Sequence, residues 1–289
     1  MSFVENKLNP MSSKHSSTIS SWLPFIVIPL ALLAAYFIYS NILGNPSNFV
    51  GEDPSNEPLK DNYYGVIYKG GPIVIILISF QIILLTFILE RMVSIGLAAG
   101  RKGGQQFVLK VREFIQKDDF TGAAKYCNKQ KGSVAAVLYA GLNSYGELHE
   151  ASALGDEEMQ VITLQKEMEE ATQLELPELN RNMPIISTLA SISTLIGLLG
   201  TVTGMIKAFA ALARVGQPDA VGLANGISQA LVTTALGIST AAVAIVFYNL
   251  LSTRIDKIMY AIDEATYTLI NTLKIKLAAG NAKVGTETE

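Results

Sequence analysis

Residues 194–205 read TLIGLLGTVTGM, and residues 226–238 read GISQALVTTALGI. Both stretches are apolar, yet small and hydroxyl side chains take many of the places where a lipid-facing helix carries Leu, Ile or Phe. Gly197, Gly200 and Gly204 recur at three- and four-residue steps, which places them on one helical face. Because small residues let membrane helices approach closely, the two stretches predict a tightly packed pair of transmembrane helices.

The composition of the whole chain agrees with a membrane protein. Charged residues make up 16% of the 289 residues, against about 25% in a typical soluble domain, and the mean hydropathy is +0.34. Apolar stretches long enough to cross a bilayer, which takes about 20 helical residues, lie at residues 22–43, 71–92, 183–212 and 222–253. Because a membrane-spanning backbone must satisfy its own hydrogen bonds, the predicted fold class is an all-α integral membrane protein with four transmembrane helices.

Several function classes are excluded by composition. A net charge of −3 removes the electrostatic basis for binding nucleic acid. The single cysteine, Cys127, rules out an internal disulfide framework and any cysteine-based metal cluster. His15 and His149 lie far apart in the sequence, so no metal site or cofactor is predicted. No nucleophile is paired with a base, and an enzyme is therefore not expected.

The basic residues predict the orientation of the spans, because cytoplasmic flanks carry an excess of Lys and Arg. The segment between the second and third spans is rich in both, whereas the loop after the first span has four acidic residues against two lysines. The segments outside the spans are then a cytoplasmic tail (1–21), a periplasmic loop (44–70), a cytoplasmic helical region (93–182), a periplasmic turn (213–221) and a cytoplasmic C-terminal helix and tail (254–289).

The first span has two interpretations. Lys7 and Lys14 precede it, as in a secretory signal peptide. However, its apolar core is long, and Tyr36 and Phe37 stand where small residues should precede a cleavage site. We therefore expect a retained, additional transmembrane helix.

The segments next to the membrane are expected to be helical. Apolar spacing between Gly104 and Tyr145 predicts two or three short helices, one of them capped by Asp118. No proline interrupts Val221 to Leu277, so this stretch predicts one continuous helix that extends from the membrane into the cytoplasm.

Hydroxyl side chains form stripes on both small-residue spans. Thr194 and Thr201 are seven residues apart in the third span, and Thr233 lies in the fourth span beside Thr234 and Gln229. Close packing alone explains a single threonine, whose hydroxyl can bond the carbonyl four residues back. Two aligned stripes also favour a polar seam.

Charge is nearly absent from these two spans. Lys207 stands at the outer end of the third span, where its side chain is expected to extend toward the membrane surface. Proton and cation carriers usually hold an ionisable group inside the membrane. Any titrating group is therefore expected to come from another chain.

These motifs resemble a known family. Residues 194–205 and 226–238 are similar to the third-helix and last-helix signatures of the MotA/TolQ/ExbB proton channel family. Gly70-Gly-Pro72, which opens a span ending in Leu89-Glu90-Arg91, and the cytoplasmic segment Asp119–Ala124 fit the same family. The resemblance covers about Tyr64 to Leu277. Because of the motif residues and the short outer turn, the ExbB/TolQ branch fits better than the flagellar MotA branch, and within that branch the expected match is ExbB.

The resemblance implies an assembly. A pentameric ring of this subunit would surround an ExbD- or TolR-like single-span protein that carries a membrane aspartate. Thr201 and Thr234 match the family's pore threonines, and Gln229 stands where the family commonly has glutamate. Thr194 stands where proline is frequent. The predicted ion pathway comprises Thr201, Thr234, Gln229, Thr233 and Thr194, and the predicted helix-packing residues are Gly197, Gly200, Gly204, Gly226 and Gly237.

The expected function is an ExbB-like stator subunit of a proton-motive-force-driven motor in the bacterial inner membrane. It would energise TonB-dependent outer-membrane transport, with a TonB-like protein as the recipient of the work. The alternative is a TolQ-like subunit of the Tol-Pal envelope system, acting on a TolA-like protein. A secondary transporter is less expected because no ionisable midplane site or internal repeat is found, and a non-conducting scaffold follows if the stripes serve packing alone.

Overall fold

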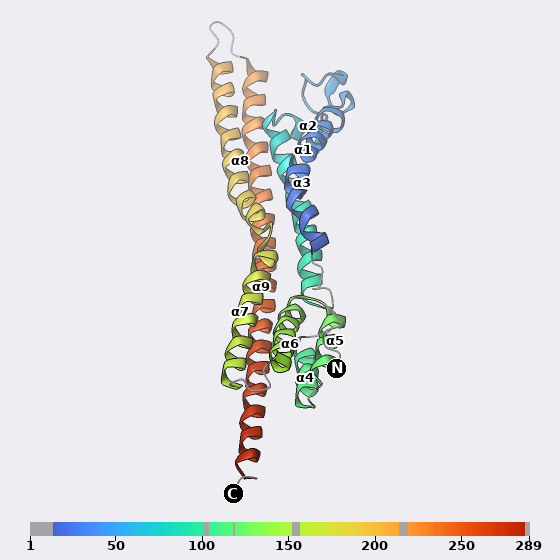
Figure 1. Ribbon diagram of the computed structural model, residues 1–289. Coiled ribbons are helices and arrows are strands. Elements are labelled where there is room, and N and C mark those ends of the chain that lie inside the picture. Colours follow the sequence, from blue (N-terminus) through green and yellow to red (C-terminus); the bar gives the residue numbers. More distant parts are fainter. Residues whose placement is uncertain (1–13, 101–103, 118, 152–156, 214–218, 287–289) are drawn as a thin grey trace. The chain divides into compact units, whose positions relative to one another are not determined.

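The computed structural model describes residues 14–100, 104–117, 119–151, 157–213 and 219–286 (Figure 1). In this part of the chain the regular secondary structure is helical, and one isolated β-bridge joins Phe49 to Pro58. The α-helices are α1 (Lys14–Phe37), α2 (Tyr63–Tyr68), α3 (Ile73–Ala98), α4 (Gly104–Gln116), α5 (Phe120–Gln130), α6 (Ser133–Ala151), α7 (Glu157–Asn180), α8 (Met183–Leu212) and α9 (Ala220–Thr286).

Helices long and apolar enough to cross a membrane occur at all four predicted places. They comprise Trp22–Leu43, Ile73–Ala98 and the apolar parts of two longer segments, Val161–Leu212 and Ala220–Ile275. The continuous helix predicted for Val221–Leu277 is confirmed by α9, and α4, α5 and α6 confirm the short helices. The fold is therefore that of an all-α, multi-pass membrane protein.

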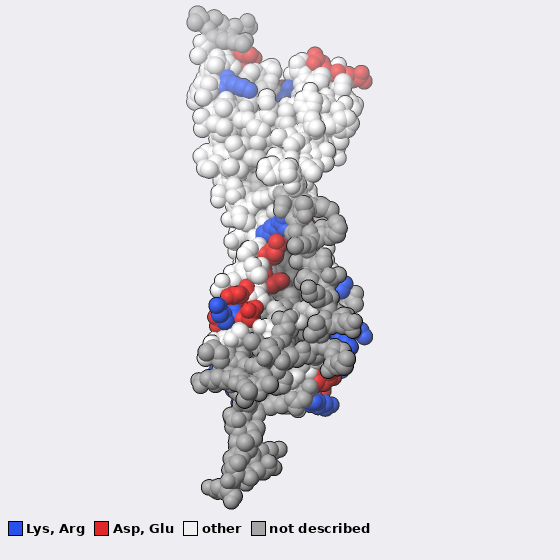
Figure 2. Space-filling model, in the orientation of Figure 1, with Lys and Arg blue, Asp and Glu red and all other residues white. Residues whose placement is uncertain are grey.

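The chain divides into two compact units. We call residues 13–90 and 182–249 the apolar unit, and residues 1–12, 91–181 and 250–289 the charged unit. On the face of the apolar unit seen in Figure 2, most side chains are uncharged, and charged ones gather at the end that holds the loop between α1 and α3. This distribution suits a unit whose sides face lipid.

Within the apolar unit, α8 and α9 approach one another through glycines. A Cβ atom on Gly226 would lie 2.6 Å from the Ala208 backbone nitrogen and 2.7 Å from the Gly204 carbonyl oxygen. A Cβ atom on Gly237 would lie 2.7 Å from the Ser193 carbonyl oxygen and 2.9 Å from Gly197 Cα. These separations leave no room for a side chain, so the backbones themselves form the contact.

The first helix exposes most of its apolar surface. Ala31 and Ala35 are buried, whereas Phe25 and Leu33 are 74% and 68% exposed. Two prolines, at positions 24 and 29, lie inside α1. An exposed helix of this composition fits a lipid-facing transmembrane span.

The loop between α1 and α3 has a defined structure. The Asn48 amide donates to the carbonyls of Ile42 and Leu43 at 2.8 and 3.0 Å, and the Asn62 amide donates to Asn48 Oδ1 at 3.0 Å. The rings of Tyr39 and Tyr68 stack with centroids 4.7 Å apart. Side-chain hydrogen bonds to the backbone thus hold this segment together in place of a regular element.

The charged unit contains a conventional helical core. Cys127 is fully buried, and burial raises the pKa of its thiol to about 12, so it remains protonated. Arg91 is 2% exposed, and its guanidinium donates to the Glu178 carbonyl oxygen at 3.4 Å.

The predicted cap of α5 requires a correction. Asp119 caps this helix, because its Oδ1 accepts the Gly122 N–H at 2.8 Å. The cap predicted from sequence, Asp118, lies outside the described residues. The two carboxylates are adjacent, and only the local backbone geometry decides which of them reaches the first turn.

We predict that Gly226→Ala destabilises the protein by about 1–3 kcal/mol, because its methyl group meets the backbone of α8. Gly96→Ala is the matched control, since a Cβ there has nothing within 4 Å, and alanine favours the helix by about 1 kcal/mol. The measurement is the thermal unfolding midpoint in detergent. Equal midpoints for the two variants would contradict the glycine contact.

Candidate functional site

The polar centre of the α8–α9 pair is a contact between two threonines. The hydroxyls of Thr201 and Thr234 are hydrogen-bonded to each other. Each is also within reach of the Ala230 carbonyl oxygen, at 3.3 Å from Thr201 and 3.0 Å from Thr234. Both residues are partly exposed in this chain.

The close helix contact positions this threonine pair. Thr201 Oγ1 is 3.4 Å from the Gly197 carbonyl oxygen, and Thr234 Oγ1 is 3.5 Å from the same oxygen. Because Gly197 has no side chain, the hydroxyl of the opposite helix reaches its backbone. The hydroxyls therefore share carbonyl acceptors from both helices.

Thr233 makes a different contact. Its side chain is fully buried, and its hydroxyl donates to the Gln229 and Ala230 carbonyls of its own helix at 2.8 and 3.2 Å. A Cβ atom placed on Gly200 would collide with this side chain. Thr233 thus fills the notch that Gly200 leaves in α8.

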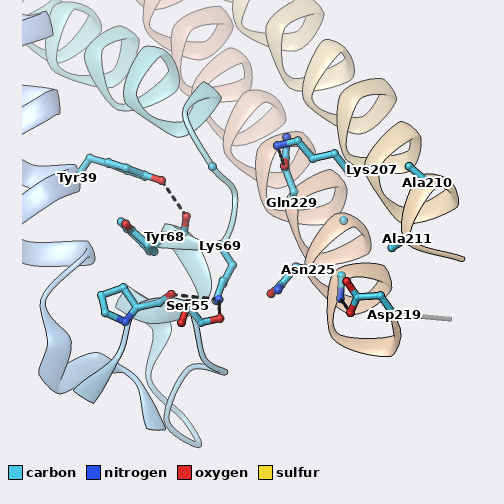
Figure 3. Close-up of a pocket in the computed structure, with 14 residues that line it drawn as sticks. Tyr39, Ser55, Tyr68, Lys69, Lys207, Ala210, Ala211, Asp219, Asn225 and Gln229 are labelled. Carbon is cyan, nitrogen blue, oxygen red and sulfur yellow. Dashed lines mark hydrogen bonds between the residues drawn. The ribbon is translucent and has the colours of Figure 1, made fainter. Parts of the chain in front are cut away.

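A second polar group lies nearer the outer end of the helices. Gln229 is 5% exposed, and its amide nitrogen donates to Thr203 Oγ1 at 3.3 Å. Lys207 Nζ donates to the amide oxygen of Gln229 at 2.9 Å (Figure 3). The amide therefore connects a hydroxyl to an ammonium group, using its donor on one side and its acceptor on the other.

Two residues of this group were not predicted from sequence. Thr203 was not selected, although its four-residue spacing from Lys207 puts both on one face of α8. Lys207 was expected to extend toward the membrane surface, whereas its ammonium group bonds Gln229. Thr194, which was selected, has an exposed side chain two turns from Thr201 along α8 and takes no part in either group.

The electrostatics of the site follow from its composition. Between residues 183 and 212 Lys207 is the only charged residue, and residues 220–249 contain none. Hydroxyls and an amide can pass hydrogen bonds along but cannot hold a proton at neutral pH. Residues 183–212 and 220–249 therefore offer hydrogen-bonding groups but no carboxylate.

Comparisons with known proteins agree with this class of membrane protein. The profile of the MotA/TolQ/ExbB proton channel family matches residues 129–264. The Tol-Pal system protein TolQ of Haemophilus influenzae is 30% identical over 195 residues, which cover 64% of this chain and 80% of that protein. TolQ of Pseudomonas aeruginosa is 26% identical over 190 residues, covering 63% and 82%.

A shorter match involves the other branch of the family. The biopolymer transport protein ExbB of Salmonella typhimurium is 34% identical over 77 residues, which cover 27% of this chain and 32% of that protein. The fold and the site thus define a multi-pass membrane protein with a polar seam between two small-residue helices. The chain belongs to the MotA/TolQ/ExbB proton channel family.

We predict that Gln229→Glu keeps the stability of the protein, because Lys207 can pair with a carboxylate and Thr203 can donate to it. Gln229→Leu is the control, and it should destabilise by about 1–3 kcal/mol because both neighbours lose their partner. The thermal unfolding midpoint in detergent measures both. A Glu variant as unstable as the Leu variant would show that the site tolerates no charge.

Proposed function

We propose that this chain is a stator subunit of an ion-driven motor in the bacterial inner membrane. The observation that carries the proposal is the hydroxyl pair of Thr201 and Thr234, set between two helices that bring no carboxylate of their own. The two hydroxyls can form hydrogen bonds to a group that carries a proton, and they do not take up the proton themselves. Thr201 and Thr234 line the pathway, Gln229 and Thr233 flank them, and Thr194 extends the stripe along α8.

The two helices that carry the threonine pair contain no acidic residue within residues 183–212 and 220–249, which favours a partner protein. A proton pathway through the hydrocarbon needs an ionisable group, and α8 and α9 provide none at the level of the threonines. We therefore propose a single-span ExbD- or TolR-like protein whose membrane aspartate lies beside the threonine pair. A pentamer of this chain around that partner places several identical pairs of Thr201 and Thr234 around one carboxylate. The carboxylate can then move from one threonine pair to the next.

The recipient of the work separates two candidate functions. The matches to TolQ run over 195 and 190 residues. These lengths favour a function in the Tol-Pal system, in which a TolA-like protein would receive the work. The match to ExbB is higher in identity but spans 77 residues, which favours transport energised through a TonB-like protein. We place the Tol-Pal function first because its support covers more of the chain.

We predict that Thr234→Val abolishes energised function while the subunit still assembles. Valine keeps the shape of threonine but removes the hydroxyl that contacts Thr201. Thr240→Val is the matched control, because among the described residues the Thr240 hydroxyl bonds only the Leu236 carbonyl of its own helix, at 2.8 Å. Proton entry into liposomes that hold the purified complex measures the effect. Normal entry with Thr234→Val would count against a pore role.

The partner is tested by purification. We expect the chain to co-purify from its own membranes with a single-span protein that has one aspartate in its span. A gene deletion then separates the two functions, since a Tol-Pal role predicts defective envelope constriction and an ExbB role predicts loss of TonB-dependent uptake. A preparation of this chain alone that conducts protons would refute the shared-site mechanism.

A further inference from the structure

Two lysines line one pocket at the outer end of the apolar unit. The pocket has a volume of ≈ 640 Å³ and lies between the loop that precedes α3 and the ends of α8 and α9 (Figure 3). Lys69 contributes from the loop side and Lys207 from α8, and Asn225 extends toward the pocket from α9. A cavity with two ammonium groups and an amide offers donors in excess of acceptors.

The loop holds Lys69 in place without neutralising it. Its Nζ donates to the carbonyls of Pro54 and Ser55 at 3.2 and 3.0 Å and lies 5.7 Å from the centroid of the Phe49 ring. Burial lowers the pKa of Lys69, although the charges of Asp53 and Glu57 act in the opposite direction. The ammonium is thus partly desolvated, and its direct partners are neutral.

Lys207 is also oriented by a neutral partner. Its single described hydrogen bond goes to the Gln229 amide oxygen at 2.9 Å. The Lys207 side chain is therefore directed from α8 toward α9. An ammonium group has three donors, and two of them remain for another ligand. Within the described residues, neither Lys69 nor Lys207 has a carboxylate within ion-pair distance.

The charges that line the pocket do not balance. Asp219 is the one carboxylate among the residues that line it, and Asp219 Oδ1 accepts the Gly222 N–H at 2.8 Å at the start of α9. Two cations therefore line the pocket with one carboxylate, which caps a helix. A cationic pocket beside apolar helices is stabilised by a counter-anion, because a paired charge is better tolerated near the membrane than an unpaired one.

We propose that this pocket binds a carboxylate, with Lys207 as its main contact and Asn225 as a neutral donor. A carboxylate accepts up to four hydrogen bonds, which matches the free donors of Lys207 and the amide of Asn225. The inference deepens the proposed function, since it gives the outer end of the seam a docking point for an acidic residue of the partner protein. A free carboxylate from the periplasm is the other source of the same chemistry.

The first measurement uses this chain alone in detergent, with sodium acetate as the probe. We expect 100 mM acetate to raise the thermal unfolding midpoint of the unsubstituted protein by roughly 2 °C over sodium chloride at equal ionic strength. Lys207→Gln should lose this shift, because it removes the ammonium group. Lys60→Gln is the control, because Lys60 lies in the loop between α1 and α3 and does not line the pocket.

The second measurement uses the complex purified with its single-span partner. We expect Lys207→Gln to weaken retention of the partner at least about 10-fold, and Lys207→Arg and Lys60→Gln to keep it within about 2-fold. Loss of the acetate shift with unchanged retention would assign the pocket to a free carboxylate. If no partner co-purifies, the motor proposal fails, and the acetate measurement still decides the pocket. Equal acetate shifts in the unsubstituted protein and Lys207→Gln, with equal retention, would overturn the inference.

Discussion

The contact of backbone on backbone between α8 and α9 is the constraint on which the site depends. Gly204 and Gly226 face one another so closely that a Cβ on either would lie 2.7 Å from the other's carbonyl oxygen. At this separation the Thr201 hydroxyl reaches the Ala230 carbonyl across the interface. If larger residues held the helices apart, each hydroxyl would turn back to its own helix, and the seam would lose its shared acceptors.

This packing also explains why the seam is polar and yet uncharged. Hydroxyls that share backbone carbonyls are satisfied within the helix pair, so they are tolerated in an apolar unit at little cost. A carboxylate at the same depth would need a cation or several donors beside it. In the proposed function, this chain supplies neutral hydroxyls and a second chain supplies the acid.

Sequence alone predicted the parts that depend on local pattern. The four spans follow from hydropathy, and α9 follows from the absence of proline between residues 221 and 277. The small-residue steps indicate the glycines at the α8–α9 contact, whereas the pair of Thr201 and Thr234 follows from the resemblance to the family's pore threonines. The spans and the glycine contact need only hydropathy and helical periodicity, which a sequence displays directly.

The features that sequence missed depend on the third dimension. The loop between α1 and α3 is organised by Asn48, whose partners at Ile42 and Leu43 are carbonyls that no sequence pattern marks. The direction of Lys207 was equally hidden, because a lysine at the end of a span can reach outward or turn back. A buried amide on the facing helix decides between the two.

The neutral side chain at position 229 has a physical reason in this arrangement. Gln229 donates to Thr203 and accepts from Lys207, so its two ends serve two different neighbours. A glutamate at this position would pair with Lys207 and neutralise it, leaving the outer pocket with less positive charge to attract an anion. The amide fixes the direction of Lys207 without cancelling its charge, because an amide oxygen accepts a hydrogen bond but carries no net charge. Gln229 therefore orients Lys207 and leaves its positive charge among the residues that line the outer pocket.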